Sequence, residues 1–122
     1  MHLNVSPRHV NGVTILDLQG RITYGDESKR LRDCVRQLVA ENRTRIVLHC
    51  KHLTQLDSGG VMTLLSCYAL VQAAGGDLKL AALDSGLEKM LRVTHLLPLM
   101  EAWRSDEEAL ARFNPEVKPS PA

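Results

Sequence analysis

The sequence of 122 residues is poor in aromatic side chains and in excess charge. One Trp, two Tyr and one Phe make up 3% of the chain, and the formal net charge is +1. Few aromatic rings leave few platforms for stacking nucleic-acid bases, and a near-neutral chain has no field that gathers nucleic acid or anionic membranes. No apolar run approaches the roughly 18 residues of a membrane-spanning helix. We therefore expect neither a nucleic-acid partner nor direct membrane insertion.

The sequence also lacks paired cysteines and the motifs of common cofactor sites. Its three cysteines have no paired spacing, which indicates reduced thiols of a cytoplasmic protein. His49, Cys50 and His52 could suggest a metal site, but neighbouring strand residues point to opposite faces and a fourth ligand is missing. The phosphate-binding patterns G-x-x-x-x-G-K-[ST] and G-x-G-x-x-G after a strand do not occur. We expect no metal and no cofactor.

Hydrophobic periodicity predicts an opening hairpin followed by alternating helices and strands. The hairpin covers residues 3–18 with its turn near Asn11 and Gly12, and the strand that closes it ends at Gly20. Further strands are predicted at residues 45–50, 78–83 and 99–103, with loops at 21–25 and 51–56. The predicted helices run over about residues 27–41, from Asp57 to Gly75, from Ser85 to before Pro98, and from Ser105 to Phe113.

This order of elements predicts an α/β domain with a mixed sheet of four to five strands and about four helices. Asp26, Asp57, Ser85 and Ser105 are expected to cap the helix starts. The domain is expected to cover residues 1–113. Residues 114–122 contain three prolines and are expected to form a disordered tail.

One helix start combines Asp57, Ser58, Gly59 and Gly60. Asp57 can accept hydrogen bonds from the free N–H groups of the first turn, which places Ser58 beside the positive end of the helix dipole. Both glycines are poor helix formers, so they indicate close approach by another backbone or by a phosphate. Because sites in such folds favour the carboxyl ends of parallel strands, we expect this helix start and residues 20–25 to share one edge of the sheet.

The residues alone leave three roles open for Ser58. It can be a small residue of purely structural use at a helix start. It can be a catalytic serine, although Leu56 breaks the G-x-S-x-G pattern and a base would have to come from elsewhere in the fold. It can also be a phosphoacceptor, because the dipole and the free N–H groups favour a phosphate there.

Taken together, these features resemble a STAS domain, the sulfate-transporter and anti-sigma-factor-antagonist fold, in its stand-alone bacterial form. The similarity covers about residues 3–113. It rests on the strand at 13–18 followed by Gly20, on residues 46–48 followed by 53–60, and on the glycine pair at 75–76 before the strand at 78. The Asp-Ser-x-Gly pattern from Asp57 to Gly60 is its most specific element.

The resemblance implies an anti-sigma factor antagonist, which is a binding protein and not an enzyme. In such antagonists the serine matching Ser58 is phosphorylated by a partner that is both a serine kinase, of the histidine-kinase-like ATPase type, and an anti-sigma factor. The unphosphorylated antagonist binds this partner and frees the sigma factor. A weak homodimer is a further expectation. The residues expected to contact the partner are Thr23, Tyr24, Gly25, Asp57, Ser58, Gly59, Gly60 and Met62.

Three positions depart from the family pattern. The family often has acidic residues, which flank the phosphoserine loop, where this chain has Thr23 and His49, and Ser, Thr or Ala where it has Gly59. These departures favour an alternative function, a non-switching STAS module of a signalling scaffold or of a lipid-transport complex. A hydrolase that uses Ser58 is the third hypothesis.

Overall fold

The computed structural model describes residues 3–97 and 99–113, and the expected disordered tail at 114–122 lies outside them. Five strands form one mixed sheet in the order β1-β2-β3-β4-β5. The strands are β1 (Asn4–Val10), β2 (Val13–Ile22), β3 (Arg45–Leu56), β4 (Asp77–Ala81) and β5 (Ala102–Trp103). The helices are α1 (Asp26–Ala40), α2 (Ser58–Ala73), α3 (Ser85–Val93) and α4 (Asp106–Phe113). The predicted mixed α/β architecture is therefore confirmed.

The predicted hairpin is formed by β1 and β2, which pair antiparallel with Val10 opposite Val13. Asn11 and Gly12 both have positive φ, at 52° and 82°, as the favoured two-residue hairpin turn requires. All later pairings in the sheet are parallel. The carboxyl ends of β2 and β3 therefore reach the same edge of the sheet.

Both of these strands are longer than the sequence predicted. β2 continues past Gly20 to Ile22, and β3 continues past Cys50 to Leu56, through segments expected to be loops. Their pairing is irregular here, with register shifts after Asp17 and after Gly20. The shifts break the alternation of buried residues, so that the strand pattern is not visible in the sequence. The extension carries β3 directly into α2.

Two predicted helix caps are also wrong. The N-cap of α1 is Gly25, with φ at 107° and no side-chain cap, and Asp26 is the first helical residue. The N-cap of α3 is Asp84 rather than Ser85, and its side chain accepts the N–H of Leu87 at 2.8 Å. At α1 a glycine stands where a polar cap was expected, and at α3 an aspartate and a serine are neighbours that could both cap the helix. Sequence patterns place a helix end only to within one or two residues.

The predicted cap of α4 is confirmed. The N–H of Glu108 donates to Ser105 Oγ at 3.2 Å, and the Glu108 carboxylate in turn accepts the N–H of Arg104 at 2.9 Å. Two backbone N–H groups at the start of α4 thus find their acceptors in side chains of the same segment.

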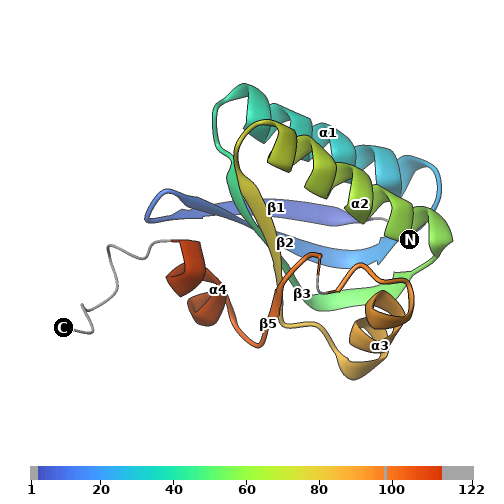
Figure 1. Cartoon of the computed structure of the whole chain (residues 1–122). Coiled ribbons are helices and arrows are strands. Elements are labelled where there is room, and N and C mark those ends of the chain that lie inside the picture. The colour runs from blue at the N-terminus through green and yellow to red at the C-terminus, as the bar shows by residue number, and fades with distance from the viewer. Residues whose placement is uncertain (1–2, 98, 114–122) are drawn as a thin grey trace.

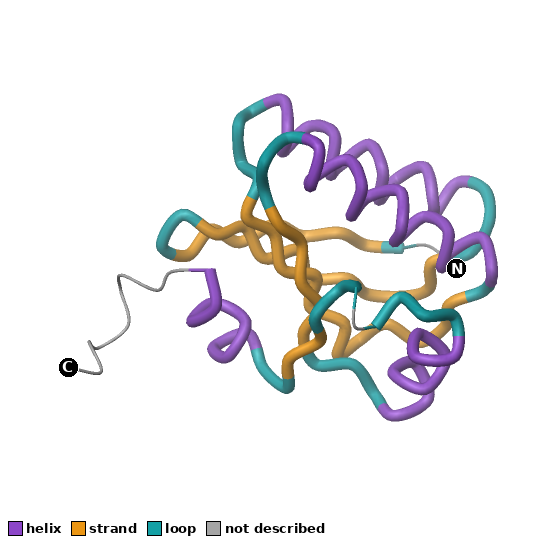
Figure 2. Tube along the Cα trace, in the orientation of Figure 1, coloured by secondary structure: helices purple, strands orange, loops and turns teal. Residues whose placement is uncertain are grey.

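The hydrophobic core has a larger and a smaller part, on opposite faces of the sheet. The larger part lies beneath α1 and α2, which run side by side above the strands, and it also takes up Leu87 and Leu91 of α3 (Figure 1). The smaller part lies where α4 packs Ala109 and Phe113 against β2, β3 and β4. Figure 2 shows the strands between these helical layers. The cores leave the edge at the ends of β2 and β3 free to carry a site.

His49 and Cys50 point to opposite faces, as the strand geometry predicted. Cys50 is buried in the larger core, whereas His49 Nδ1 lies 2.8 Å from Oδ1 of Asp106 at the start of α4. Within residues 3–97 and 99–113, no three His, Cys, Asp or Glu side chains come together as a metal site would require. In the same residues no helix is long and apolar enough to cross a membrane.

An ion-pair network joins the hairpin to α4. Arg8 donates to both carboxylate oxygens of Asp17, at 2.6 and 2.9 Å, and to Asp106 at 2.8 Å. The hydrogen bonds from Arg8 hold the pKa of Asp17 below its ordinary value.

The network predicts a dependence of stability on acid pH. The lowered pKa of Asp17 contributes stability above about pH 3.9, the ordinary value of an aspartate, and this contribution is lost as the pH falls towards the folded-state pKa. In the Arg8→Gln variant the folded-state pKa of Asp17 rises, so its free energy of unfolding should fall less steeply than that of the unmodified protein between about pH 5 and pH 3. Urea unfolding at a series of pH values measures this slope, with Arg30→Gln as an exposed control. Equal slopes for the two variants would contradict the assignment.

Candidate functional site

The candidate site lies where β2 and β3 end and α1 and α2 begin, at the right of Figure 1. Asp57 follows β3 directly and is the N-cap of α2, as predicted. Its Oδ1 accepts the N–H of Gly60 at 2.8 Å, and its Oδ2 accepts the N–H of Tyr24 at 3.2 Å. One carboxylate therefore joins the start of α2 to the loop between β2 and α1.

These hydrogen bonds fix the charge of the cap. The N–H of Gly60 is the largest cause that lowers the pKa of Asp57, followed among the donors by the N–H groups of Tyr24 and Gly59. Hydrogen bonds from backbone donors favour the charged carboxylate. Asp57 is thus an anion at neutral pH, in place beside the hydroxyl of Ser58.

Gly59 and Gly60 lie close to another stretch of backbone, which is the end of β2 and the residues that follow it. A Cβ on Gly60 would meet the carbonyl oxygen of Ile22 and lie 2.7 Å from Leu56 Cδ1. A Cβ on Gly59 would lie 2.9 Å from Tyr24 Cβ and 3.0 Å from its Cα. The close approach that the two glycines indicated is therefore made by the end of β2, against which they allow α2 to pack.

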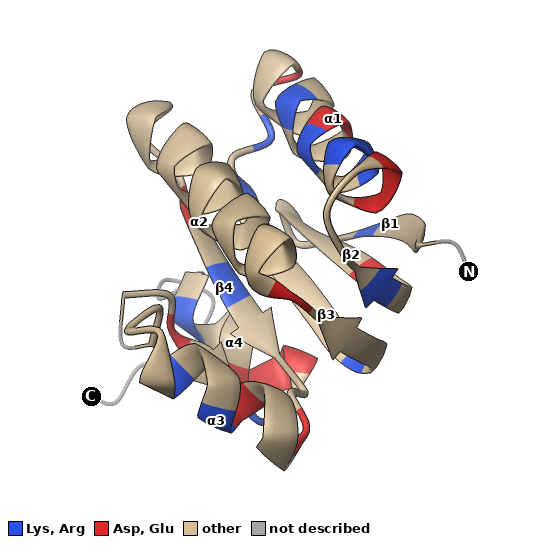
Figure 3. Cartoon of the chain, turned by 90° about the vertical axis from the view of Figure 1, so that its right-hand side faces the viewer, with Lys and Arg blue, Asp and Glu red and all other residues tan. Residues whose placement is uncertain are grey.

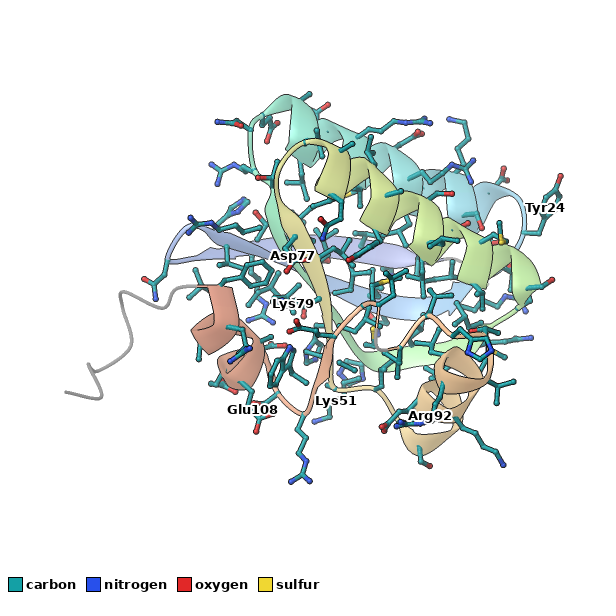
Figure 4. The ribbon with its side chains drawn as sticks, in the orientation of Figure 1. Tyr24, Lys51, Asp77, Lys79, Arg92 and Glu108 are labelled. Carbon is teal, nitrogen blue, oxygen red and sulfur yellow. The ribbon has the colours of Figure 1, made fainter. Side chains whose placement is uncertain are left out.

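Ser58 is the first residue of α2 and its side chain is exposed. Within the described residues no hydrogen bond engages its hydroxyl. Two large hydrophobic side chains stand near this helix start, Tyr24 with 86% and Met62 with 60% of its surface exposed. Figure 4 shows Tyr24 projecting away from the ribbon into solvent. Exposed apolar groups around a free hydroxyl are typical of a contact surface.

A cavity of about 480 Å³ adjoins this surface between α1 and α2. Four of the predicted contact residues line it, namely Tyr24, Gly25, Gly59 and Met62. The other four, Thr23, Asp57, Ser58 and Gly60, lie beside it and do not line it. The sequence analysis missed six lining residues, which are Asp26, Ser28, Lys29, Arg32, Thr63 and Ser66. Three of those on α1, Asp26, Lys29 and Arg32, are spaced at i, i+3 and i+6 and so share a face of the helix, but this spacing does not reveal which helix packs beside that face.

The two positions that depart from the family's acids lie in different places. Thr23 is at the site, where its hydroxyl donates to Glu27 Oε1 at 2.8 Å and this bond lowers the pKa of the Glu27 carboxyl. A carboxylate is therefore held one helical turn from Thr23. His49 lies seven residues before the end of β3, which at about 3.3 Å per residue is roughly 23 Å along the strand. The expectation that position 49 flanks Ser58 is wrong.

The chain contains a second helix start with the same local pattern. Asp84 caps α3, Ser85 is its first residue and Gly86 follows. Ser85 is exposed like Ser58, but a Cβ on Gly86 would meet only Asp84 Oδ1, at 3.5 Å. The pattern around Ser58 is therefore set apart by its contact with the end of β2, not by its own residues.

The contact between α2 and β2 predicts opposite effects of the same substitution at two glycines. Gly60→Ala forces a methyl group against the Ile22 carbonyl and should lower the free energy of unfolding by about 1–3 kcal/mol. Gly86→Ala has room and a better helix former, so it should be neutral or raise stability by up to about 1 kcal/mol. Chemical denaturation of the two variants measures both values. A Gly60→Ala protein as stable as Gly86→Ala would show that the helix is not packed this closely.

Comparison with known proteins agrees with the fold. Residues 4–109 match the model of the STAS domain family. An anti-sigma F factor antagonist of Paenibacillus polymyxa is 27% identical over 118 residues, which are 93% of this chain and 97% of that protein. An anti-sigma factor antagonist from Mycobacterium paratuberculosis has a similar fold, with a TM-score of 0.81 at 17% identity over 92% of this chain and 94% of its own.

The phosphorylated form of the Bacillus cell fate determinant SpoIIAA is also similar, with a TM-score of 0.69 at 21% identity over 89% of this chain and 98% of its own. At such identities the structural matches show the fold alone. The family model, however, covers most of the sequence and confirms the resemblance inferred from the motif and the order of elements. This chain belongs to the STAS domain family.

Proposed function

We propose that this protein is an anti-sigma factor antagonist that binds its partner through the start of α2 and releases it when Ser58 is phosphorylated. The observation that carries the proposal is the exposed Ser58 hydroxyl on the first turn of a helix, near Tyr24 and Met62. The names of the relatives support the role, since one is an anti-sigma F factor antagonist and another was solved in a phosphorylated form.

The unmodified helix start suits a protein partner. Tyr24 and Met62 offer apolar area that gains from burial, and aromatic side chains of this kind often carry much of the binding energy of an interface. Between them Ser58, Gly59 and Gly60 bring no charge that would have to be desolvated. Thr23, Gly25 and Asp57 complete the proposed contact set.

A phosphate on Ser58 would oppose docking without opposing the fold. It adds a charge of about −1.5 to −2, which the helix dipole and the free N–H groups of the first turn favour. The same charge would have to be desolvated under a partner, close to the Asp57 carboxylate. The modified protein is therefore expected to remain folded and to lose its contact surface.

The proposed partner is an anti-sigma factor that is also a serine kinase of the histidine-kinase-like ATPase type, met in the cytoplasm. This partner supplies the ATP, and the protein described here binds and is modified but catalyses no reaction. The non-switching STAS module and the Ser58 hydrolase are tested by the same experiments.

The first experiment maps the modification. The protein is incubated with ATP and the purified kinase of this type that is encoded nearest to its gene, and phosphate is located by mass spectrometry. Ser58 and Ser85 are both exposed first residues of a helix after an aspartate cap. We expect phosphate on Ser58 and none on Ser85, because Tyr24 and Met62 stand near Ser58 alone. Modification of Ser85 to the same extent would show that the kinase recognises any aspartate-capped helix start, without contribution from Tyr24 and Met62.

The second experiment measures binding to the same kinase by calorimetry. Ser58→Ala should bind like the unmodified protein, and Ser58→Glu should bind at least about tenfold more weakly, since it places a charge within the interface. Ser85→Glu is the matched control and should bind normally. Absence of phosphate together with equal binding by Ser58→Ala and Ser58→Glu would instead identify a non-switching module. Ester hydrolysis that Ser58→Ala abolishes would favour the hydrolase.

A further inference from the structure

The cavity beside Ser58 is one end of a longer groove between α1 and α2. A second cavity of about 400 Å³ shares Arg32 and Ser66 with the first and continues to Ala69 and Leu70. From Gly59 to Leu70 the wall formed by α2 is roughly 17 Å long, at about 1.5 Å per helical residue. The groove can thus hold about three turns of another helix.

The α2 wall of the groove carries no charge. None of the 16 residues of α2 is Asp, Glu, Lys or Arg. Its side chains along the groove are Met62, Thr63, Ser66, Cys67, Ala69 and Leu70. A helix on the surface of a globular protein normally presents charged side chains to solvent, so an uncharged outer face is typical of a helix that another element covers.

The α1 wall carries three cations and one carboxylate, that of Asp26 at its start, and its positive charge is least compensated at one residue. Lys29, Arg32 and Arg36 line the groove at positions i, i+3 and i+7 of α1. Lys29 and Arg36 share the carboxylate of Asp33, at 2.8 and 3.7 Å. Arg32 has no ion pair within the described residues, and it lies where the two cavities join. Figure 3 shows α1 with basic and acidic residues beside the uncharged ribbon of α2.

We infer that this groove binds an amphipathic helix of the anti-sigma factor, with its apolar ridge against α2 and acidic side chains against Arg32 and its neighbours. The inference rests on the proposed function and extends it from the helix start to the whole groove. Helices dock into grooves through side chains spaced at i, i+3, i+4 and i+7. The three cations stand along the α1 wall at i, i+3 and i+7, so they can meet side chains on one flank of such a helix. Charge complementarity selects an acidic flank, because α2 offers nothing to neutralise Arg32.

This geometry also gives the switch a second physical cause. The groove begins at Gly59, next to Ser58. A phosphate on Ser58 would carry its charge at this end of the groove, and charges act on each other over about 8 Å, the screening length at physiological salt. The acidic flank and the phosphate repel each other, so phosphorylation weakens the docked helix even where it does not touch the phosphate.

The test compares two charge reversals on the same helix. Binding to the same kinase is measured by calorimetry at about 50 and about 300 mM NaCl, which changes the screening length roughly twofold. Arg32→Glu should weaken binding about tenfold at low salt and flatten its salt dependence. Arg30→Glu makes the same charge change at an exposed position outside the groove and should stay within about twofold of the unmodified protein.

A third variant should act in the opposite direction. Asp33→Asn frees Lys29 and Arg36 from their shared carboxylate, so it should strengthen binding about two- to fivefold at low salt. Thermal unfolding of all three variants separates loss of fold from loss of binding.

The outcomes separate the inference from the function on which it rests. If Ser58→Glu weakens binding but Arg32→Glu and Arg30→Glu behave alike, the groove is not the docking site and the proposed function stands. If the unmodified protein does not bind the kinase at all, the proposed function fails and the groove is overturned with it. Selective loss in Arg32→Glu, with the gain in Asp33→Asn, supports both.

Discussion

The contact between the start of α2 and the end of β2 is the constraint on which the site depends. The two oxygens of the Asp57 carboxylate bind the N–H groups of Gly60 and Tyr24, and Gly60 lies directly against the carbonyl of Ile22. This contact turns one side of the first helical turn inward, so that residues on the other side must face solvent. Ser58 therefore lies on the outer side of a helix start that is held against β2, whereas the equally exposed Ser85 starts a helix without such a contact.

The fold was predictable wherever a local pattern fixes the backbone. Asn11 and Gly12 specify a two-residue hairpin turn, and Asp57 specifies a helix start, because in each case the side chain or its absence acts on neighbouring backbone groups. The extension of β3 to Leu56 was not predictable, because the register shifts against β2 remove the alternation of buried residues. The cap of α1 was missed for a related reason: Gly25 has no side-chain signal, and the adjacent Asp26 imitates one.

The site was predictable as a set of positions but not as a surface. Asp57 and Tyr24 are 33 residues apart, and nothing local to either one says that they share a hydrogen bond. The start of α3 shows the limit plainly, since Asp84 and Ser85 repeat the pattern of Asp57 and Ser58 without a strand packed against the following glycine. Arg32 belongs to a basic helix face that sequence reasoning assigns to solvent. Only the position of α2 turns that face into one wall of a groove.

A site built in this way favours regulation by charge over regulation by shape. The start of α2 is held on one side by the backbone of β2 and on the other by the Asp57 carboxylate, which leaves little room for it to move. Phosphate at such a place is expected to change what can bind rather than how the helix lies. The same reasoning explains why Thr23 need not weaken the proposed switch: its hydroxyl binds Glu27, so a carboxylate stays near the site although position 23 itself is uncharged. The electrostatic character of the surface is thus set by pairs of residues, and single positions in the sequence describe it incompletely.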